Sequence, residues 1–335
     1  MTDVAAAPAL SRVKDPEANY EVRVSGRRMV GEDIVSLDLV RLDGEPFPAW
    51  EPGSHIDLFL GTDGLGDPLT RQYSLWGAVE DRSTWRIGVL KDPKSRGGSA
   101  RVHEDLTEGT RLTVRGARNH FPLEPASSYV FFAGGIGITP ILPMVREVER
   151  AGRPWKLYYM ARNRQRLALL DEIGTLPSAN VVLHCDDESG LIDLAGITAS
   201  LGTADHVYAC GPGPLLDVLE KMAEEAGRWT FHCERFAAAP PAAGSEDKPF
   251  EVLLAKSSRT LQIPAGVSCL KVLREAGVDV DWSCSEGVCG TCETEVLEGV
   301  PDHRDVVLTK EERAANETMM PCVSRARSAR IVLNL

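Results

Sequence analysis

Four cysteines near the C-terminal end of the chain are spaced in a way that could bind metal. Cys284, Cys289 and Cys292 lie together in "CSEGVCGTC", and Cys322 follows after a longer gap. Zinc sites usually pair their cysteines in two C-x2-C turns, whereas C-x4-C-x2-C with a distant fourth cysteine is typical of plant-type [2Fe–2S] clusters. The spacing therefore predicts an iron–sulfur cluster, and zinc or a structural group of cysteines are the alternatives.

The residues around these cysteines suit a cluster. Gly287 and Gly290 would let the backbone wrap closely and point amide hydrogens at the sulfurs. Because four cysteines complete the ligand set, we expect His55 and His303 to be structural; a Rieske cluster would need two histidine ligands. The other four cysteines, Cys185, Cys210, Cys233 and Cys269, stand singly in apolar stretches. There cysteine behaves as a small hydrophobic residue, and we expect this of all but Cys210.

A second group of residues could bind a nucleotide. The stretch "YVFFAGGIGITPILPMV" combines a strand, a glycine-rich turn and the start of a helix. We expect Gly134, Gly135 and Gly137 to let a pyrophosphate approach the amides at the helix start. There Thr139 would cap the helix and Pro140 would suit its first turn. The turn is not the G-x-G-x-x-G fingerprint, so plain packing is the alternative.

A later stretch strengthens the nucleotide interpretation. In "YACGPGPLLD", the residues Cys210, Gly211 and Pro212 come at the carboxyl end of a predicted strand, where open α/β sheets bind their ligands. Whether NADH or NADPH binds depends on the residues that follow the predicted strand "WKLYYMA". Three arginines there could read the extra phosphate of NADPH, or could be ordinary solvated residues; they are Arg162, Arg164 and Arg166.

Three local patterns would position these groups. Alternating runs such as "IVSLDLVRL", "HIDLFL", "TRQYSLWG", "TWRIGVL" and "RLTVRG" occupy residues 20–123 and predict antiparallel strands in a small barrel. Strand-like and helical segments alternate over residues 128–236, which predicts a doubly wound parallel sheet. After "AAAPPAAGSEDK", which offers little to a core, the chain ends with a hairpin, a helix and a strand. That helix would begin after Ser268 and end before Gly277.

The composition excludes several classes of protein. The chain has 335 residues, 43% hydrophobic and 26% charged, and no apolar run approaches the roughly 20 residues needed to cross a bilayer. Its formal net charge of −12 argues against nucleic acid or an anionic membrane as a partner. Residues 1–19 lack the pattern of a signal peptide and are expected to be a leader. We therefore expect a soluble, cytoplasmic protein with reduced cysteines.

The segments around the cysteines also resemble a known family. "CSEGVCGTCETEVLEG", "DHRDVVLT" and "PCVSRA" resemble the ferredoxin domain of the phthalate dioxygenase reductase and vanillate demethylase reductase family. The resemblance runs from about residue 20 to the end of the chain and implies a β-grasp fold for residues 249–335. "AGGIGITP" and "CGPGPL" resemble the nicotinamide-binding domain of the ferredoxin reductase superfamily. This implies that Cys210 is a catalytic residue near the nicotinamide ring.

A flavin would link the two sites, because NADH gives up two electrons together whereas the cluster takes one at a time. The stretch "TRQYSL" resembles the R-x-Y-S flavin motif of the same superfamily. The resemblance implies that Arg71 and Tyr73 hold the phosphate and ribityl chain, and that Ser74 is a catalytic contact near ring nitrogen N5. Trp76 and Gly77 follow where a small and a polar residue are expected, which leaves the ring-edge contacts open. The motif itself spans Arg71, Gln72, Tyr73 and Ser74.

The loop "RGGSARVHEDL" distinguishes the two common flavins. Gly97 and Gly98 would leave the amides of a short helix open to a phosphate, and Ser99 would cap that helix. In the family, this loop holds the single phosphate of FMN, so FMN is expected rather than FAD. For Phe236, core packing at the end of the last strand is the alternative to covering the flavin. The further lining positions implied by the resemblance are Val89, Leu90, Lys91, Thr139 and Phe236.

Together these patterns predict a multidomain oxidoreductase. Its parts would be a leader (1–19), an FMN-binding antiparallel β-barrel (20–124), an NAD-binding doubly wound α/β domain (125–236), a linker (237–248) and a β-grasp ferredoxin domain (249–335). Electrons would pass from NADH through FMN to the [2Fe–2S] cluster, and the family resemblance implies that the acceptor is the terminal oxygenase of a Rieske non-haem iron system. A cytochrome P450 or another oxygenase is the alternative acceptor, and a non-enzymatic electron carrier or redox sensor is the alternative function. Acidic residues that could form the acceptor surface, or merely a solvated face, are Glu286, Glu293, Glu295 and Glu298.

Overall fold

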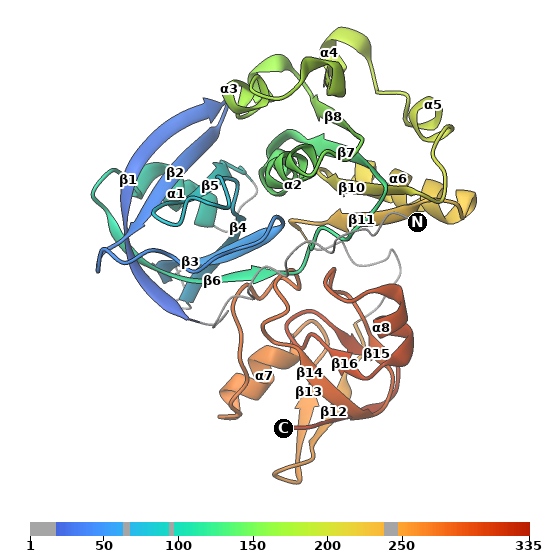
Figure 1. Cartoon of the computed structure of the whole chain (residues 1–335). Coiled ribbons are helices and arrows are strands. Elements are labelled where there is room, and N and C mark those ends of the chain that lie inside the picture. The colour runs from blue at the N-terminus through green and yellow to red at the C-terminus, as the bar shows by residue number, and fades with distance from the viewer. Residues whose placement is uncertain (1–17, 63–67, 94–96, 238–246) are drawn as a thin grey trace, which may run out of the picture. The chain divides into compact units, whose positions relative to one another are not determined.

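The described part of the chain forms two compact units. The computed structural model describes residues 18–62, 68–93, 97–237 and 247–335. One unit ends at Glu234 and the other begins at Arg235. Figure 1 colours the first unit from blue to yellow and the second from orange to red. The predicted leader and linker lie almost entirely outside the described residues.

The N-terminal part of the first unit is an antiparallel sheet of six strands in the order β4-β3-β6-β1-β2-β5. A bridge between Leu75, directly after β4, and Ile87 of β5 joins the two edges into a barrel. Alternate side chains of every strand, such as Ile56 and Leu58, fill its interior. The predicted barrel is therefore confirmed. Its elements are β1 (Asn19–Gly31), β2 (Ile34–Arg41), β3 (Ser54–Thr62), β4 (Pro68–Ser74), β5 (Trp85–Leu90), α1 (Gly98–Asp105) and β6 (Arg111–Asn119).

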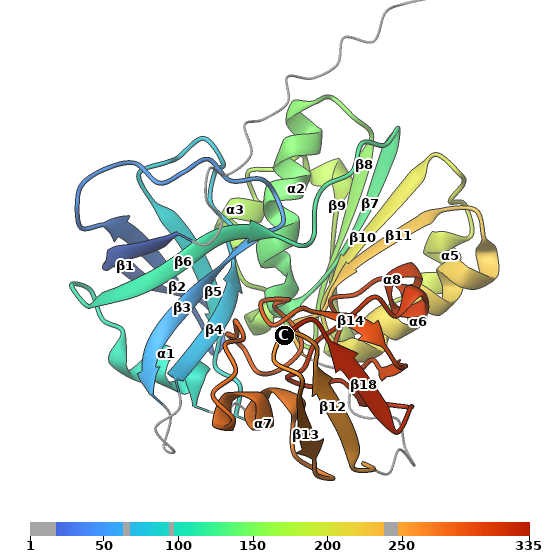
Figure 2. The same ribbon diagram turned by 90° about the horizontal axis from the view of Figure 1, so that it is seen from below.

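The C-terminal part of the first unit is a parallel sheet in the order β11-β10-β7-β8-β9. The chain runs outward from β7 to β9 and then returns to β10 on the other side of β7. The carboxyl ends of β7 and β10 thus form the switch point at which such sheets bind ligands. Helix α2 packs on one face of the sheet and α6 on the other (Figure 2). The strands are β7 (Ser128–Gly134), β8 (Trp155–Ala161), β9 (Val181–Cys185), β10 (Asp205–Cys210) and β11 (Thr230–Glu234).

The predicted doubly wound arrangement is confirmed by the helices between these strands. The apolar face of α2 is buried, including Ile141, Met144, Val145 and Val148. The longer helices are α2 (Ile138–Arg150) and α6 (Gly213–Ala226), and the shorter ones are α3 (Leu170–Ile173), α4 (Asp186–Ser189), α5 (Leu194–Thr198) and the 3-10 turns η1 (Gly135–Gly137), η2 (Arg164–Arg166) and η3 (Ser178–Asn180).

Two predicted helix caps are wrong. Helix α2 begins after Gly137 without a side-chain cap, and Thr139 Oγ1 instead donates to a main-chain carbonyl of the preceding turn at 3.0 Å. Helix α1 begins after Gly97, and Ser99 Oγ accepts from the amide of Asp92 at 3.1 Å. In both places a glycine leads directly into the helix, so the first amides carry no side-chain cap.

The second unit is a mixed sheet in the order β13-β12-β18-β14-β16, with α7 packed against it. Ser268 caps α7 by accepting from the amide of Lys271 at 3.3 Å, and Gly277, with φ of 73°, follows the helix end. This is the predicted β-grasp fold. Its elements are β12 (Phe250–Leu254), β13 (Arg259–Ile263), α7 (Cys269–Glu275), β14 (Thr294–Glu298), β15 (Pro301–Asp302), α8 (Lys310–Ala315), β16 (Thr318–Met319), β17 (Arg325–Ala326) and β18 (Arg330–Leu333).

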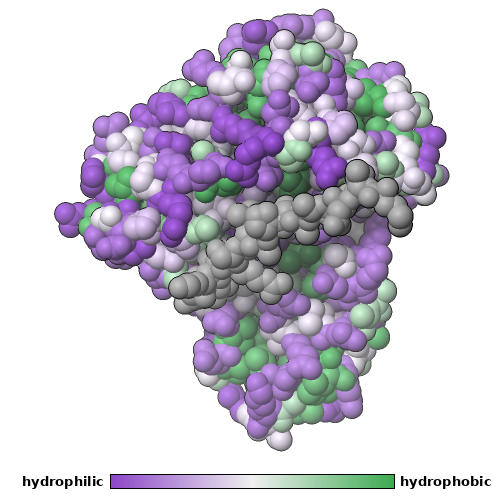
Figure 3. All heavy atoms as spheres, in the orientation of Figure 1, coloured by the Kyte–Doolittle hydropathy of each residue, from purple (hydrophilic) through white to green (hydrophobic). Residues whose placement is uncertain are grey.

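The surface of both units is mainly polar. Hydrophilic residues cover most of the face seen in Figure 3, and hydrophobic ones stand in small groups. Scattered exposed apolar side chains of this kind are usual on proteins. Within the described ranges, no helix combines the length and the apolar character that spanning a bilayer requires.

Candidate functional site

The four cysteines of the C-terminal loop lie together in the second unit. Their side chains are only 2 to 6% exposed. The thiol of Cys284 donates to Cys289 and that of Cys322 donates to Cys292, so the sulfurs lie in two pairs at contact distance. These donated hydrogen bonds lower the pKa of the Cys289 and Cys292 thiols. Four converging buried sulfurs are the donor set that a [2Fe–2S] cluster requires.

The backbone of the cysteine loop also fits a cluster. The amide of Glu286 donates to Cys284 Sγ at 3.2 Å, as expected where amides surround the sulfurs. Gly287 and Gly290 both have φ of 72°, in the left-handed region that favours glycine. A Cβ on Gly287 would lie 2.5 Å from Cγ2 of Val323, so the close approach of these segments also needs glycine.

A buried aspartate fastens the neighbouring segment to the cysteine loop. Asp305 is 3% exposed, and its Oδ2 accepts from the amides of Val307 at 3.1 Å and Leu308 at 2.9 Å. The amide of Val306 donates to the carbonyl of Gly287 at 2.9 Å. Sequence patterns placed Asp305 in the family segment "DHRDVVLT" but gave no sign of this role, since its partners are main-chain groups.

In the first unit, Arg71 lies across the start of helix α1. A Cβ on Gly98 would be 2.6 Å from Arg71 Cγ and 2.7 Å from its Nε, so a glycine is needed for this side chain to pass. Arg71 Nη1 donates to the carbonyl of Thr70 at 2.8 Å. Gly97 has φ of 91°, and no atom of the described residues lies within 4 Å of the place its Cβ would take. A guanidinium beside the first amides of a helix suits a phosphate, so these residues fit FMN.

Strand β5 of the barrel contacts the start of α2. A Cβ on Gly88 would lie 2.9 Å from Cγ2 of Thr139 and 3.2 Å from Cδ1 of Ile136. The predicted lining residues Val89 and Leu90 follow directly. Val89 is 1% exposed and its side chain belongs to the barrel core, so it can face a cofactor only through its main chain. This contact brings the predicted flavin strand and the predicted nucleotide turn together.

Two of the three glycines in the nucleotide turn serve close packing. A Cβ on Gly137 would lie 2.1 Å from the carbonyl oxygen of Cys210, and one on Gly134 would lie 2.5 Å from Cδ of Pro212. Both contacts seat the turn against the end of β10. Gly135 has φ of 54°, and within the described ranges nothing lies within 4 Å of the place its Cβ would take. Packing therefore accounts for Gly134 and Gly137, and a ligand approach at Gly135 stays a prediction.

The two predicted catalytic residues, Ser74 and Cys210, both lie beside Glu234. Ser74 Oγ lies 3.3 Å from Glu234 Oε2, and Glu234 is the register partner of Cys210 across β10 and β11. Burial raises the pKa of Glu234 to about 8, against a smaller opposite effect of the Ser74 hydroxyl. Burial likewise raises the pKa of the Cys210 thiol well above its ordinary value. At neutral pH the site thus contains a hydroxyl, a protonated thiol and a neutral carboxyl group.

Glu234 was missed by the sequence patterns. It stands in "HCERF", where only Phe236 was predicted to be a site residue. A charged residue at the carboxyl end of a strand of the parallel sheet is the signal that could have found it. Phe236 has 42% of its surface exposed, and its covering role stays a prediction.

A buried network on the outer face of the barrel holds Gln72. The carboxylate of Asp57 is 0% exposed and accepts from Gln72 Nε2 at 2.8 Å, Arg115 Nη2 at 2.7 Å and Arg118 Nη2 at 2.5 Å. Burial by itself would raise the pKa of Asp57, but the Arg118 charge and these hydrogen bonds lower it on balance. Sequence patterns missed this network because its members come from three strands.

Other predicted residues have local partners. Lys91 Nζ pairs with Glu104 at 2.9 Å. Trp76, where the chain departs from the family motif, is 1% exposed and belongs to the core beside α2. Arg166, one of the arginines that could read NADPH, pairs with Glu32 at 3.1 Å. Trp76 is thus closed off from a ligand, whereas Lys91 and Arg166 keep 41% and 38% of their side-chain surface exposed, and their roles stay predictions.

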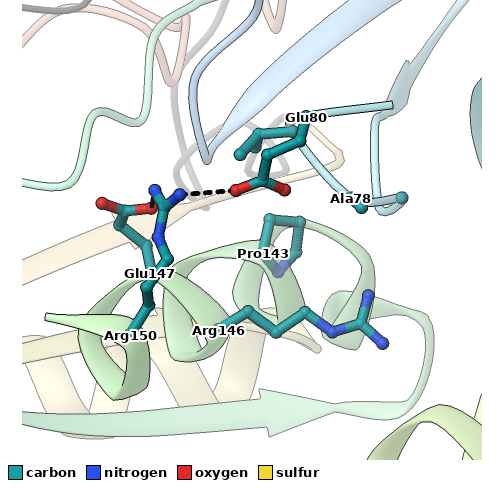
Figure 4. A pocket seen from close by; sticks show the side chains of 8 residues that line it. Ala78, Glu80, Pro143, Arg146, Glu147 and Arg150 are labelled. Carbon is teal, nitrogen blue, oxygen red and sulfur yellow. Dashed lines mark hydrogen bonds and ion pairs between the residues drawn. The ribbon is translucent and has the colours of Figure 1, made fainter. Parts of the chain in front are cut away.

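A cavity of about 180 Å³ lies where residues 77–80 face helix α2 (Figure 4). Arg150 pairs with Glu80 at 2.6 Å, and Arg146 extends away from Glu80 toward Glu172. The predicted flavin, nicotinamide and cluster residues do not line this cavity. It is therefore separate from the candidate site.

Comparisons with known proteins agree with the cluster-binding domain and with the fold. A family model described as a 2Fe-2S iron-sulfur cluster binding domain matches residues 252–327. The chain is 42% identical over 322 residues to a vanillate O-demethylase oxidoreductase from Pseudomonas sp. (strain HR199 / DSM 7063), covering 94% of this chain and 99% of the relative.

Solved structures of two kinds are similar to the chain. Phthalate dioxygenase reductase matches with a TM-score of 0.69 and 36% identity, over 95% of this chain and 98% of that protein. An intact type IV self-sufficient cytochrome P450 monooxygenase matches with a TM-score of 0.83 and 39% identity, over 97% of this chain. The chain spans 43% of that monooxygenase, less than half its length.

Proposed function

Because the chain belongs to the phthalate dioxygenase reductase and vanillate demethylase reductase family, we propose that it passes electrons from NADH through FMN and a [2Fe–2S] cluster to the terminal oxygenase of a Rieske non-haem iron system. The contact of Gly88 in β5 with Thr139 in α2 carries this proposal. Hydride transfer needs its two partners in close, fixed contact, and this contact joins the strand next to the flavin residues to the nucleotide turn.

The chain's own residues would hold the cofactors and set their surroundings. Arg71 and the first turn of α1 would bind the phosphate of FMN, and Gly135 would face the NADH pyrophosphate. When bound, FMN accepts a hydride and releases its electrons singly. Glu234, whose Oε2 lies 3.3 Å from Ser74 Oγ, would keep its proton below pH about 8 and thereby keep negative charge away from the hydride-transfer region.

The partner protein would be the oxygenase component of the same system. Vanillate and phthalate, in the names of the relatives, suggest an oxygenase substrate that is aromatic or similarly small. We place the docking surface beside the cluster loop, because exposed carboxylates there would attract a basic partner and speed association. The carboxylates are Glu286, Glu293, Glu295 and Glu298, of which all but Glu286 are exposed.

We also propose the arrangement and location of the chain. Residues 20–124, 125–236 and 249–335 would be the FMN, NAD and ferredoxin domains, joined by a linker at 237–248. The eight unpaired cysteines support a cytoplasmic location, where thiols stay reduced.

A second candidate acceptor is a cytochrome P450. The similarity to the self-sufficient monooxygenase favours it, because that protein carries a part like this chain. The two acceptors can be separated by mixing the NADH-reduced chain with a purified Rieske oxygenase or with a purified P450 and following oxidation of the chain by stopped flow.

Anaerobic addition of NADH to the purified chain tests the proposed function. We expect the flavin and cluster absorbance to bleach within seconds, and NADPH to act much more slowly. A carrier or sensor without reductase activity would show no bleaching, and that result would overturn the proposal.

A further inference from the structure

A buried histidine on the barrel has a ring nitrogen without a partner. His55 is 5% exposed, and its Nε2 forms no hydrogen bond with any described residue. A buried polar atom left without a partner lowers stability, so such an atom in a native protein needs an explanation. A ligand absent from the structure is one such explanation.

Strand pairing places His55 beside the flavin motif. In the antiparallel pair β3 and β4, His55 is the direct partner of Ser74, and in the pair β3 and β6 it is the partner of Arg118. Directly opposite residues point to the same side of a sheet. The next residue, Ile56, points into the barrel core. His55 therefore lies between Ser74 and Arg118 on the outer face, where Ser74 meets Glu234.

The surroundings keep the imidazole of His55 neutral. Burial lowers the pKa of His55 to about 3, and His120 and Arg118 act in the same direction against an opposite effect of Asp57. The rings of His55 and His120 lie 5.2 Å apart, edge to face. A neutral imidazole is poorly suited to a phosphate but can form an ordinary hydrogen bond with an uncharged polar group.

We propose that His55 Nε2 forms a hydrogen bond with the polar edge of the flavin ring and so belongs to the FMN site. This inference rests on the proposed function, because it assumes that FMN binds at the face of Ser74. A flavin ring edge carries both donor and acceptor atoms, so either neutral tautomer of His55 can be satisfied. The phosphate end would be held by Arg71 and α1, and the ring end by Ser74 and His55.

The test compares full-length variants loaded with FMN. His55→Phe keeps a ring of similar size without nitrogen, and His55→Gln places an amide close to the position of Nε2. Ser36→Ala is the matched control, because Ser36 Oγ is another buried atom without a partner in the same barrel. The measurements are the FMN dissociation constant, from fluorescence of released FMN on dilution, and the visible spectrum of the bound flavin.

We expect His55→Phe to raise the dissociation constant of FMN about tenfold, as loss of one buried hydrogen bond would do, and to shift the flavin absorption bands. His55→Gln should stay within about threefold of the wild type, and Ser36→Ala should leave both measurements unchanged. An unchanged dissociation constant and spectrum in His55→Phe would overturn the inference. An equal loss in the Phe and Gln variants would also overturn it, since the ring would then act by packing.

Two further outcomes are informative. If His55→Phe does not fold, His55→Asn replaces it, because the shorter amide does not reach the position of Nε2. The Asn variant must then lose FMN affinity while the Gln variant keeps it, and equal affinities would overturn the inference. A wild-type chain that binds no FMN would overturn the proposed function instead, so the two failures are distinguishable.

Discussion

The cysteine loop and the flavin site are built in opposite ways. Three of the four cluster sulfurs come from nine consecutive residues, and the loop's own glycines and amides complete their surroundings. The flavin site depends on contacts between distant segments, such as Arg71 with Gly98 and Ser74 with Glu234. A local site should fail only when its own residues change, whereas an assembled site should fail when any of the packing contacts between its segments is lost.

The largest expected effect is the loss of the cluster on one local change. Cys289→Ser should abolish the iron content and cluster absorbance, because the ligand set is incomplete, while FMN content stays unchanged. Iron and flavin analyses of the purified variant measure this. Cys269→Ala, in the buried stripe of α7, is the control that should keep the cluster. A simultaneous loss of FMN in the serine variant would contradict the independence of the two sites.

The next effect should come from a packing contact in the assembled site. Gly137→Ala should lower the free energy of unfolding by about 3 kcal/mol, because its Cβ would meet the carbonyl oxygen of Cys210 and the backbone must shift. Gly213→Ala at the start of α6 should be nearly neutral, because no described residue has an atom within 4 Å of the added Cβ. Denaturant unfolding measures both. Equal free energies of unfolding for the two variants would show that the turn containing Gly137 does not pack closely on β10.

A smaller effect is expected at the phosphate end of the flavin site. Arg71→Gln should weaken FMN binding about 10- to 100-fold, since a charged donor to a phosphate is removed. Arg101→Gln is the control, because Arg101 bonds the carbonyls of Leu60 and Thr62 instead. Fluorescence titration with FMN measures the affinities. If both variants bind FMN equally well, the phosphate does not lie at Arg71.

The smallest effect concerns pH. The pKa of Glu234 is about 8 in the folded chain against 4.5 for an ordinary glutamate. Between these values the folded state keeps a proton that the unfolded state releases, so Glu234 lowers stability progressively as pH rises from 4.5 to 8. Glu234→Gln removes this dependence. The melting temperature of the variant relative to the wild type should therefore rise from pH about 5 to about 8 and then level off. A difference that is constant with pH would contradict the raised pKa.

The contrast between local and assembled sites also explains which predictions from the sequence were right. Helix α7 begins after Ser268 and ends before Gly277, as predicted. These predictions succeeded because an N-terminal cap and a terminating glycine act on their own helix. Thr139 and Ser99 were wrongly expected to cap helices. Each hydroxyl binds another main-chain group in its neighbourhood, and the choice between the two partners depends on how the turn packs.

The sequence by itself determined the cluster ligands, because their spacing along the chain is the chemical requirement. It also determined the three kinds of sheet, through the period of the apolar residues and the alternation of strands with helices. Only the tertiary structure decided that Ser74 meets Glu234, which is 160 residues away in the chain. The same holds for Gly137, whose role as a packing residue depends on a carbonyl of β10. Such contacts are set by the register and packing of strands, which no local pattern encodes.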